Sequence, residues 1–183
     1  KEIPKLTRDL SKRLIYCVLY GGGAKKTGSI IAPKESEHKQ YEKGKQTIDT
    51  FYQNLPAIKK LKDQVESTLS KRDYLVGIDG RHLQIRSKHS ALNQLLQSTG
   101  AITVKKATTI LYDDMTDKGL KFFKDWGFVA HVHDEYQCLL RPEYTDLFQE
   151  LAIDSFRKSG EYFKLKCPLT GEAKIGKNWC ETH

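Results

Sequence analysis

The chain has 183 residues, of which 38% are hydrophobic and 30% are charged, and its formal net charge is +8. This length allows one domain with a real core and an attached helical subdomain, and the composition is typical of a soluble globular protein. No apolar run approaches the roughly 20 residues of a membrane span, and the first residues have no signal-peptide core, so we expect a cytoplasmic protein without a membrane anchor.

The positive charge is unevenly distributed. Residues 1–72 contain 16 Lys and Arg against 8 Asp and Glu, whereas residues 73–183 contain 15 of each. A local excess of this kind indicates a surface that faces a polyanion. A set of solubilising helices explains it equally well.

Cysteine usage gives no sign of a disulfide or zinc framework. The four cysteines show no CxxC spacing and no paired histidine ligands. We therefore predict buried, reduced thiols in an intracellular protein. The four are Cys17, Cys138, Cys167 and Cys180.

The first third of the chain is predicted to be helical. Apolar residues at helical spacing favour a helix over residues 5–20 that ends at the three glycines 21–23. Two further helices are expected over about 35–54 and 56–72. The second of them carries an apolar stripe made of Ile58, Leu61, Val65 and Leu69.

The rest of the chain alternates hairpins and helices. Asp79-Gly80 between residues 74–78 and 81–86 predicts a β-hairpin, and a long helix should run from Ser87, as its N-cap, to about Lys118. A second hairpin is expected from the apolar runs 128–132 and 136–140. A helix over about 143–159 and a tail with a short strand and a loop complete the prediction. The inward residues of that helix should be Leu147, Phe148, Leu151 and Phe156.

Two acidic residues stand at the tip of the second hairpin. Asp134 and Glu135, with His133 beside them, repel each other unless a cation neutralises them. A divalent metal with a phosphate substrate would do so, and Val132 with the run 136–140 argues for a buried setting. An exposed turn is the simpler alternative. HVHDE also loosely resembles histidine-rich metallohydrolase motifs, but the later aspartate and histidines of those motifs are absent.

The first helix places four chemically informative side chains on one face. Arg8, Lys12, Tyr16 and Tyr20 follow one another at four-residue spacing, which advances about 400° along an α-helix. Two cations at this spacing oppose each other, so helix stability does not explain them. A bound triphosphate would explain them, because Arg and Lys bind phosphate oxygens and an aromatic ring can lie beside the sugar or base. The alternative is a solvated face with two half-buried tyrosines.

A polar row opens the long helix. His89, Asn93 and Gln97 recur at four-residue spacing just after Arg86. Donors in such a row can contact the minor-groove acceptors that every Watson–Crick pair presents. A polar stripe on a surface helix is the alternative reading. The leucines off this row, which should pack inward, are Leu92, Leu95 and Leu96.

These motifs together resemble DNA polymerase family A, the bacterial DNA polymerase I family. RDLSKRLIYCVLYGG is similar to its motif B and VHDE to its motif C, in the family's order and separation. The intervening GIDGRHLQIRSKHSALNQLLQSTGA resembles the replicative polymerases of short-tailed phages, as does the ending GKNW…H. The resemblance covers nearly the whole chain.

The resemblance implies an α+β fold, with a helical fingers subdomain over 1–72 and the C-terminal part of an antiparallel β palm, packed with long helices, over 73–183. It implies DNA-directed DNA synthesis by two-metal phosphoryl transfer with Mg²⁺. The implied partners are primer–template DNA and a deoxynucleoside triphosphate. The rival interpretation is a non-catalytic nucleic-acid-binding module derived from a polymerase.

The family's residue roles transfer to matching positions. Arg8 and Lys12 would bind the triphosphate, and Lys12 would also neutralise or protonate the leaving pyrophosphate. Tyr16 would face the deoxyribose and Tyr20 the template base. Asp134, with Glu135 beside it, would bind the catalytic metals. The residues implied to hold the primer–template end are Arg86, His89, Asn93, Gln97 and His133.

The chain also departs from the family pattern. The other metal-binding aspartate of the family lies in motif A, upstream of motif B, and this sequence begins after that point. We therefore expect the rest of the polymerase, or a second subunit, to supply motif A, the thumb and any exonuclease. Cys17 stands where related enzymes usually have glycine, which would crowd the position beside Tyr16.

Overall fold

The computed structural model describes residues 7–182, which divide into two compact units. The first unit ends at Leu96 and the second begins at Gln97, within the long helix α5 (Ala91–Asp117). Each unit is described by itself. The predicted boundary between fingers and palm, at residue 72, is a division by functional subdomain and not by compact unit, and it stays a prediction.

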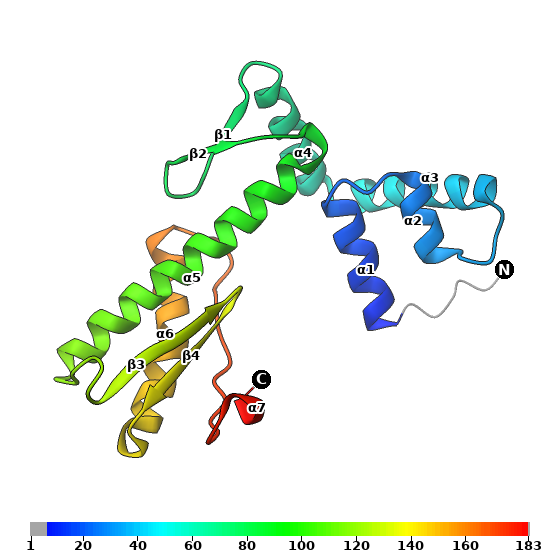
Figure 1. The fold of residues 1–183 in the computed structure, drawn as a ribbon. Helices are drawn as coiled ribbons and strands as arrows, with labels where there is room; N and C mark the ends of the chain where they lie inside the picture. Colours follow the sequence, from blue (N-terminus) through cyan, green and yellow to red (C-terminus); the bar gives the residue numbers. More distant parts are fainter. Residues whose placement is uncertain (1–6, 183) are drawn as a thin grey trace. The chain divides into compact units, whose positions relative to one another are not determined.

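Four helices open the first unit (Figure 1). The predicted helices correspond to α1, α3 and α4, although residues 5 and 6 lie outside the described part. The helix α2 was not predicted, because its sequence AKKTGSII is short and contains Gly28, a poor helix former. The bounds are α1 Arg8–Leu19, α2 Ala24–Ile31, α3 Glu37–Asn54 and α4 Pro56–Leu69.

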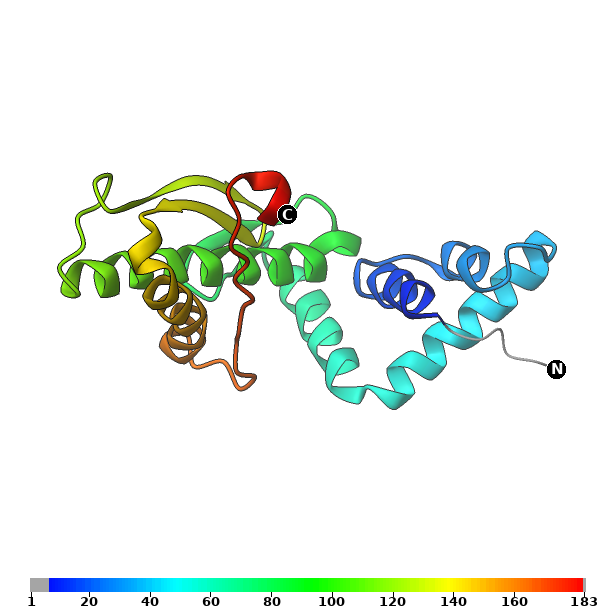
Figure 2. The ribbon, with the colours of Figure 1, turned by 90° about the horizontal axis from the view of Figure 1, so that it is seen from below.

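Two glycines let α2 and α3 approach each other closely. A Cβ atom on Gly28 would lie 1.7 Å from the Gln40 carbonyl oxygen, and one on Gly44 would lie 1.9 Å from the Ala24 carbonyl oxygen. Figure 2 shows α1 and α2 on the same side of α3. Because α1 packs on α2, the close contact between α2 and α3 also determines where α1 lies in this unit.

Gly28→Ala should therefore destabilise the first unit by about 2–4 kcal/mol, since its methyl group meets rigid backbone and forces the two helices apart. The matched control is Gly100→Ala within α5, where a Cβ atom meets nothing within 4 Å. This control should raise stability by about 0.5–1 kcal/mol through helix propensity. Urea unfolding of both variants measures the difference, and equal stabilities would contradict the close approach.

The predicted first hairpin forms with shorter strands than expected. β1 (Tyr74–Val76) pairs antiparallel with β2 (His82–Gln84), and Val76 is opposite His82. The loop thus covers residues 77–81, with Gly80 at φ +84°, rather than the two residues Asp79-Gly80 alone. Leu75 packs into the core of this unit, which also includes Val65, Leu69 and Ala91.

The start of the long helix differs from the prediction. A 3-10 turn, η1 (Lys88–Ser90), precedes α5, and the Ser87 side chain makes no capping hydrogen bond. Ser87 thus holds the N-cap position of this turn rather than of α5, and it does so without a side-chain hydrogen bond. Ser87 instead accepts hydrogen bonds at its carbonyl oxygen, from the backbone N–H and the hydroxyl of Ser90.

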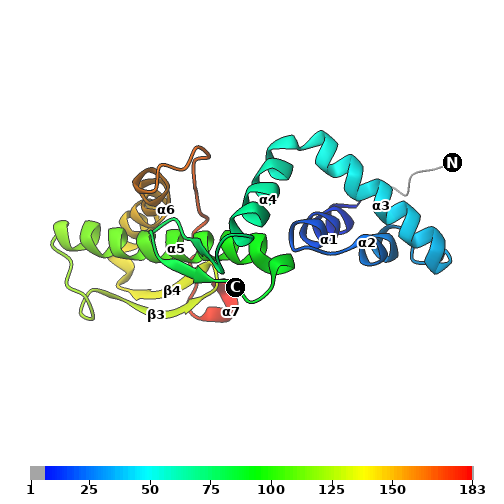
Figure 3. The same cartoon turned by 90° about the horizontal axis from the view of Figure 1, so that it is seen from above.

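The second unit packs a hairpin on two helices. β3 (Trp126–Val132) pairs antiparallel with β4 (Glu135–Leu140), which confirms the second predicted hairpin, with an irregularity between Phe128 and Ala130. One face of it lies along α5 and α6 (Thr145–Tyr162), as Figure 3 shows. The 3-10 turn η2 (Pro142–Tyr144) connects β4 to α6. The buried core residues are Leu111, Met115, Leu120, Trp126, Phe148 and Ala152.

The inward residues predicted for α6 are confirmed, because Leu147, Phe148 and Leu151 belong to this core and Phe156 stacks on Tyr136. The predicted tail strand is wrong. Residues 164–178 form no strand, because no described segment pairs with them, and the tail ends in the short helix α7 (Trp179–Thr182).

The cysteine prediction is half right. All four thiols are free; Cys17 is buried and Cys138 is partly buried, and burial raises the pKa of the Cys138 thiol to about 12. Cys167 and Cys180 are exposed, because they lie in the tail and in α7, outside both cores. Within residues 7–182, none of the helices combines the length and the apolar character needed to cross a membrane.

Candidate functional site

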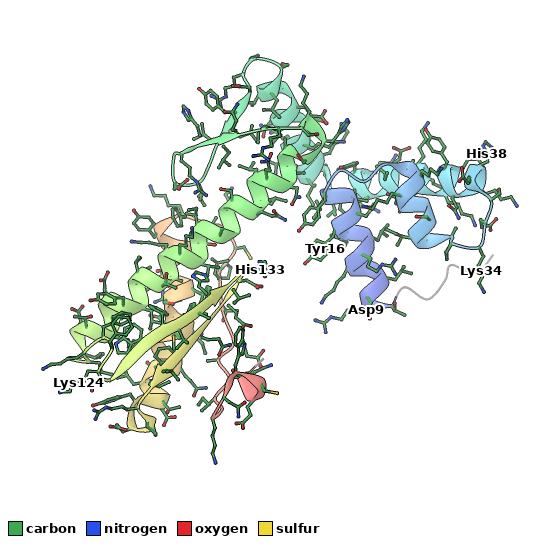
Figure 4. All side chains as sticks on the ribbon, in the orientation of Figure 1. Asp9, Tyr16, Lys34, His38, Lys124 and His133 are labelled. Carbon is green, nitrogen blue, oxygen red and sulfur yellow. The ribbon has the colours of Figure 1, made fainter. Side chains whose placement is uncertain are left out.

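The predicted face of α1 exists and is open to solvent. Arg8, Lys12, Tyr16 and Tyr20 are all exposed, with 51% of Tyr16 and 41% of Tyr20 accessible. The two tyrosine rings stack with centroids 5.5 Å apart. Figure 4 shows Tyr16 on the side of α1 that faces away from α2. Among the described residues, neither Arg8 nor Lys12 has an ion-pair partner, so both cations are available to an anion.

The opposite side of α1 holds the helix in place. Cys17 and Val18 are buried, and the Cys17 sulfur lies 3.7 Å from the Thr27 hydroxyl oxygen of α2. The sequence suggested that Cys17 would crowd the position beside Tyr16. Its side chain instead points into the packing between α1 and α2. The N-terminus of α1 is capped by the Thr7 hydroxyl, which accepts a hydrogen bond from the Leu10 amide.

The polar row before and within α5 is only partly a helical row. His89 lies in η1, so it precedes the α-helix, whereas Asn93 and Gln97 lie in α5 itself. Arg86, His89 and Gln97 are exposed. Asn93 is half-buried, and its Oδ1 atom is buried without a hydrogen-bond partner among the described residues. Of the leucines expected inward, Leu92 is buried but Leu96 is 38% exposed, because it lies at the edge of the first unit.

The acidic tip is a tight turn between β3 and β4. Val132 pairs with Glu135, so His133 and Asp134 form the two-residue connection (Figure 4). His133 has φ +54°, which is uncommon for a residue with a side chain and stores backbone strain. Strain of this kind concentrates at functional sites.

The expected buried setting of this tip is wrong for the described residues. Asp134 is exposed and Val132 is 37% exposed, while Glu135 is half-buried. Phe128, Tyr136 and Cys138 pack against the core that α5 and α6 contribute to, whereas Val129 and Leu139 are 62% and 72% exposed. The Asp134 carboxylate has no hydrogen bond or ion pair within residues 7–182, whereas Glu135 accepts one from the Gln137 amide at 2.9 Å.

The donor set fits a hard cation in part. Carboxylate oxygens are the ligands that Mg²⁺ prefers, and Asp134 offers an uncommitted pair of them beside Glu135. No group of three or more His, Cys, Asp or Glu side chains that could hold a metal occurs among the described residues. Since Mg²⁺ prefers about six oxygen ligands, these two carboxylates fit as a portion of a metal site.

A cavity of about 630 Å³ adjoins the acidic tip. Its walls are β4, α6 and the extended tail segment 170–176, and Asp134 and Glu135 lie at its lining. Two side-chain hydrogen bonds hold the tail across it: the Gln149 amide donates to the Ala173 carbonyl at 3.3 Å, and the Thr182 hydroxyl donates to Gln137 at 3.0 Å. On the cavity side of β4, no described strand pairs with its backbone.

The tail segment was missed as a part of the site by sequence reasoning. The sequence predicted a short strand and a loop there, and no local pattern indicates that the segment lines a cavity beside β4. Burial in this region also raises the pKa of the Tyr136 phenol to about 12, so this group stays neutral at physiological pH.

Comparison with known proteins links these parts. The family model described as DNA polymerase family A matches residues 1–181. The DNA-directed DNA polymerase of Enterobacteria phage T3 is 36% identical over 199 residues, which cover 100% of this chain and 27% of that protein. That of Escherichia phage T7 is 35% identical with the same coverage of both chains. DNA polymerase I of Aquifex aeolicus is 25% identical, over 98% of this chain and 31% of that protein.

A solved structure supports the fold. The POL domain of Pol1 from M. smegmatis, in complex with DNA primer-template and dNTP, has a TM-score of 0.70 to this chain at 19% identity. The match covers 86% of this chain and 29% of that chain. The chain thus spans about a quarter of the length of the phage relatives, and its α+β architecture is that of a polymerase domain.

Proposed function

The chain belongs to DNA polymerase family A, and from this we propose that it forms the nucleotide-binding part and a portion of the metal site of a DNA-directed DNA polymerase. The observation that carries the proposal is the open face of α1, where two cations, neither with an ion-pair partner in residues 7–182, precede two stacked tyrosines at four-residue spacing. The two cations suit the phosphates of an incoming nucleotide, the first tyrosine suits its sugar, and the second suits the template base opposite it.

Each side chain on α1 then has a role. Arg8 binds triphosphate oxygens through its planar fork of donors, and Lys12 places a mobile charge on the same group. The primer 3′-hydroxyl loses its proton to solvent as its oxygen bonds to the α-phosphorus, and the bond from that phosphorus to the pyrophosphate breaks. The Lys12 ammonium donates a proton to the leaving oxygen. Tyr16 faces the deoxyribose, and Tyr20 lies beside the template base.

The hairpin tip contributes metal ligands. Asp134 and Glu135 would hold part of the site for two Mg²⁺ ions, and a carboxylate from motif A would complete it. Mg²⁺, when bound, supplies Lewis-acid activation of the primer hydroxyl and charge neutralisation at the triphosphate. Minor-groove and phosphate contacts hold the primer–template end. The residues that make them are Arg86, His89, Asn93, Gln97 and His133.

The cavity beside β4 supports a further part of the proposal. The edge of β4 pairs with no other strand of the described part of the chain and faces an extended tail segment. It is a suitable place for an added strand, because both segments offer backbone hydrogen-bonding groups. We infer that the strand comes from the rest of the polymerase and brings the motif A carboxylate to Asp134.

Primer extension tests this division of labour. The 183-residue chain alone should show no extension with Mg²⁺, because two carboxylates do not hold two ions. A chimera in which this chain replaces the matched segment of the phage T3 enzyme should extend a primer in a template-dependent manner. Robust extension by the pure chain would contradict the proposal, as would a folded, DNA-binding chimera that incorporates no nucleotide.

A further inference from the structure

A stack of three exposed or half-buried side chains lies on the β1–β2 hairpin, outside the site described above. The His82 ring stacks on the Tyr74 ring with centroids 4.0 Å apart and planes at 22°. The Arg72 guanidinium lies over the same tyrosine ring, 4.6 Å from its centroid. Tyr74 is half-buried, while Arg72 and His82 are exposed.

The register of the hairpin explains why these groups meet. Tyr74 is opposite Gln84 and Val76 is opposite His82, so all four side chains project from one face of the two-stranded ribbon. The other face carries Leu75 and packs into the core. The outward face therefore presents aromatic rings to solvent, although folding alone would favour an ordinary polar surface there.

The charge around this face is positive. Residues 71–88 contain five Lys and Arg against two Asp. Both acids are engaged: Asp73 accepts a hydrogen bond from the Gln84 amide at 2.7 Å, and Asp79 pairs with Arg81 at 3.3 Å. Lys71 has no acidic partner among the described residues, so this cation remains available to an anion.

Aromatic rings interleaved with cations are the means by which proteins bind single-stranded nucleic acid without reading sequence. Bases stack on the rings, and cations follow the phosphates. We propose that the outward face of the β1–β2 hairpin binds single-stranded DNA, with bases continuing the stack of Arg72, Tyr74 and His82. This face is distinct from the predicted primer–template residues on η1 and α5.

The strand bound there would be the template ahead of the insertion site, a step that rests on the proposed function. Gly21, directly after Tyr20, lies against η1: a Cβ atom on Gly21 would be 2.3 Å from the His89 carbonyl oxygen. The hairpin strand β2 ends five residues before His89. Within the first unit, η1 thus lies against the chain directly after Tyr20 and follows β2 by a few residues, and only the unpaired template has free bases to stack.

Binding of a labelled oligothymidylate of about twelve nucleotides to the 183-residue chain, followed by fluorescence anisotropy, tests the ligand class. His82→Ala should weaken binding at least about fivefold without changing its salt dependence, since it removes a stacking ring. Arg72→Gln should reduce the slope of log affinity against log salt by about 0.7, the value for one phosphate contact on a single strand. His38→Ala and Lys45→Gln, on the exposed face of α3 in the same unit, are the matched controls and should bind like the wild type.

Two results would overturn the proposal. One is equal oligothymidylate affinity in the wild type, His82→Ala and His38→Ala, all with the same thermal unfolding midpoint. The other is polyglutamate binding that His82→Ala weakens as strongly as DNA binding, because carboxylates have no base to stack and an acidic protein segment would then be the ligand.

The template assignment has its own test in the phage T3 chimera. Lengthening the template overhang from about two to about twelve nucleotides should tighten primer–template binding, and His82→Ala should abolish this gain while nucleotide incorporation on the short overhang stays unchanged. A gain that persists in His82→Ala would refute it. If the chimera were inactive while the 183-residue chain still bound oligothymidylate, the proposed polymerase function would be contradicted, but single-strand binding by the hairpin would not.

Discussion

Asp134→Asn should lower kcat of the complete polymerase by about a thousandfold or more, which corresponds to at least about 4 kcal/mol of transition-state stabilisation. Asp134 is exposed at the hairpin turn, and its carboxylate has no partner within residues 7–182, so the substitution breaks no contact of the fold. Asparagine has the same shape and tolerates turns, but it lacks the charge that a magnesium ligand requires.

Single-turnover incorporation at saturating nucleotide, together with the Kd for primer–template DNA, separates catalysis from binding. DNA affinity should change little, because the loss concerns metal binding. Asp113→Asn, an exposed carboxylate on α5 in the same unit, is the matched control and should retain the wild-type rate. Near-normal kcat in Asp134→Asn with Mg²⁺ would show that this carboxylate is not a metal ligand.

The helices α1 and α4 of the first unit were predictable, because the sequence signals that mark them are local. Leucines at helical spacing marked α1, and Pro56 marked the start of α4. In contrast, α2 is a helix of eight residues whose Gly28 lowers its intrinsic propensity. It forms because that glycine fits against the Gln40 carbonyl, a contact between segments that no local pattern reveals.

The candidate site shows the same limit. Four-residue spacing within a regular helix places Arg8, Lys12 and Tyr16 on one open face, and Tyr20, the C-cap residue of α1, stacks on Tyr16. Burial of Asp134 was wrongly inferred from apolar neighbours, because only some of them, such as Tyr136 and Cys138, pack against the core, while Val132 and Leu139 are exposed like the turn itself.

Cross-strand and long-range contacts were the least predictable features. Nothing in the sequence pairs Tyr74 with His82, because their contact depends on a loop longer than the Asp79-Gly80 signal suggested. The cavity beside β4 likewise depends on where the tail crosses α6.

Tyr16→Phe should change the selectivity of the complete polymerase between dideoxynucleotides and deoxynucleotides by about ten- to a hundredfold. The Tyr16 ring is half-exposed and stacked on Tyr20, and its hydroxyl has no hydrogen-bond partner among the described residues. A dideoxynucleotide lacks its 3′-hydroxyl, and the Tyr16 hydroxyl can partly replace the missing hydrogen bond near the triphosphate. Such a bond in a site with little water contributes on the order of 1–3 kcal/mol.

The ratio of kcat/KM for a dideoxynucleotide to that for the matching deoxynucleotide, measured for the wild type and Tyr16→Phe in the phage T3 chimera, tests most directly that α1 forms the nucleotide site. The wild type should accept dideoxynucleotides readily, and the variant should reject them while it incorporates deoxynucleotides at a nearly normal rate. Equal discrimination by both proteins would mean that Tyr16 does not face the sugar, and would contradict the assignment of α1 as the nucleotide-binding helix.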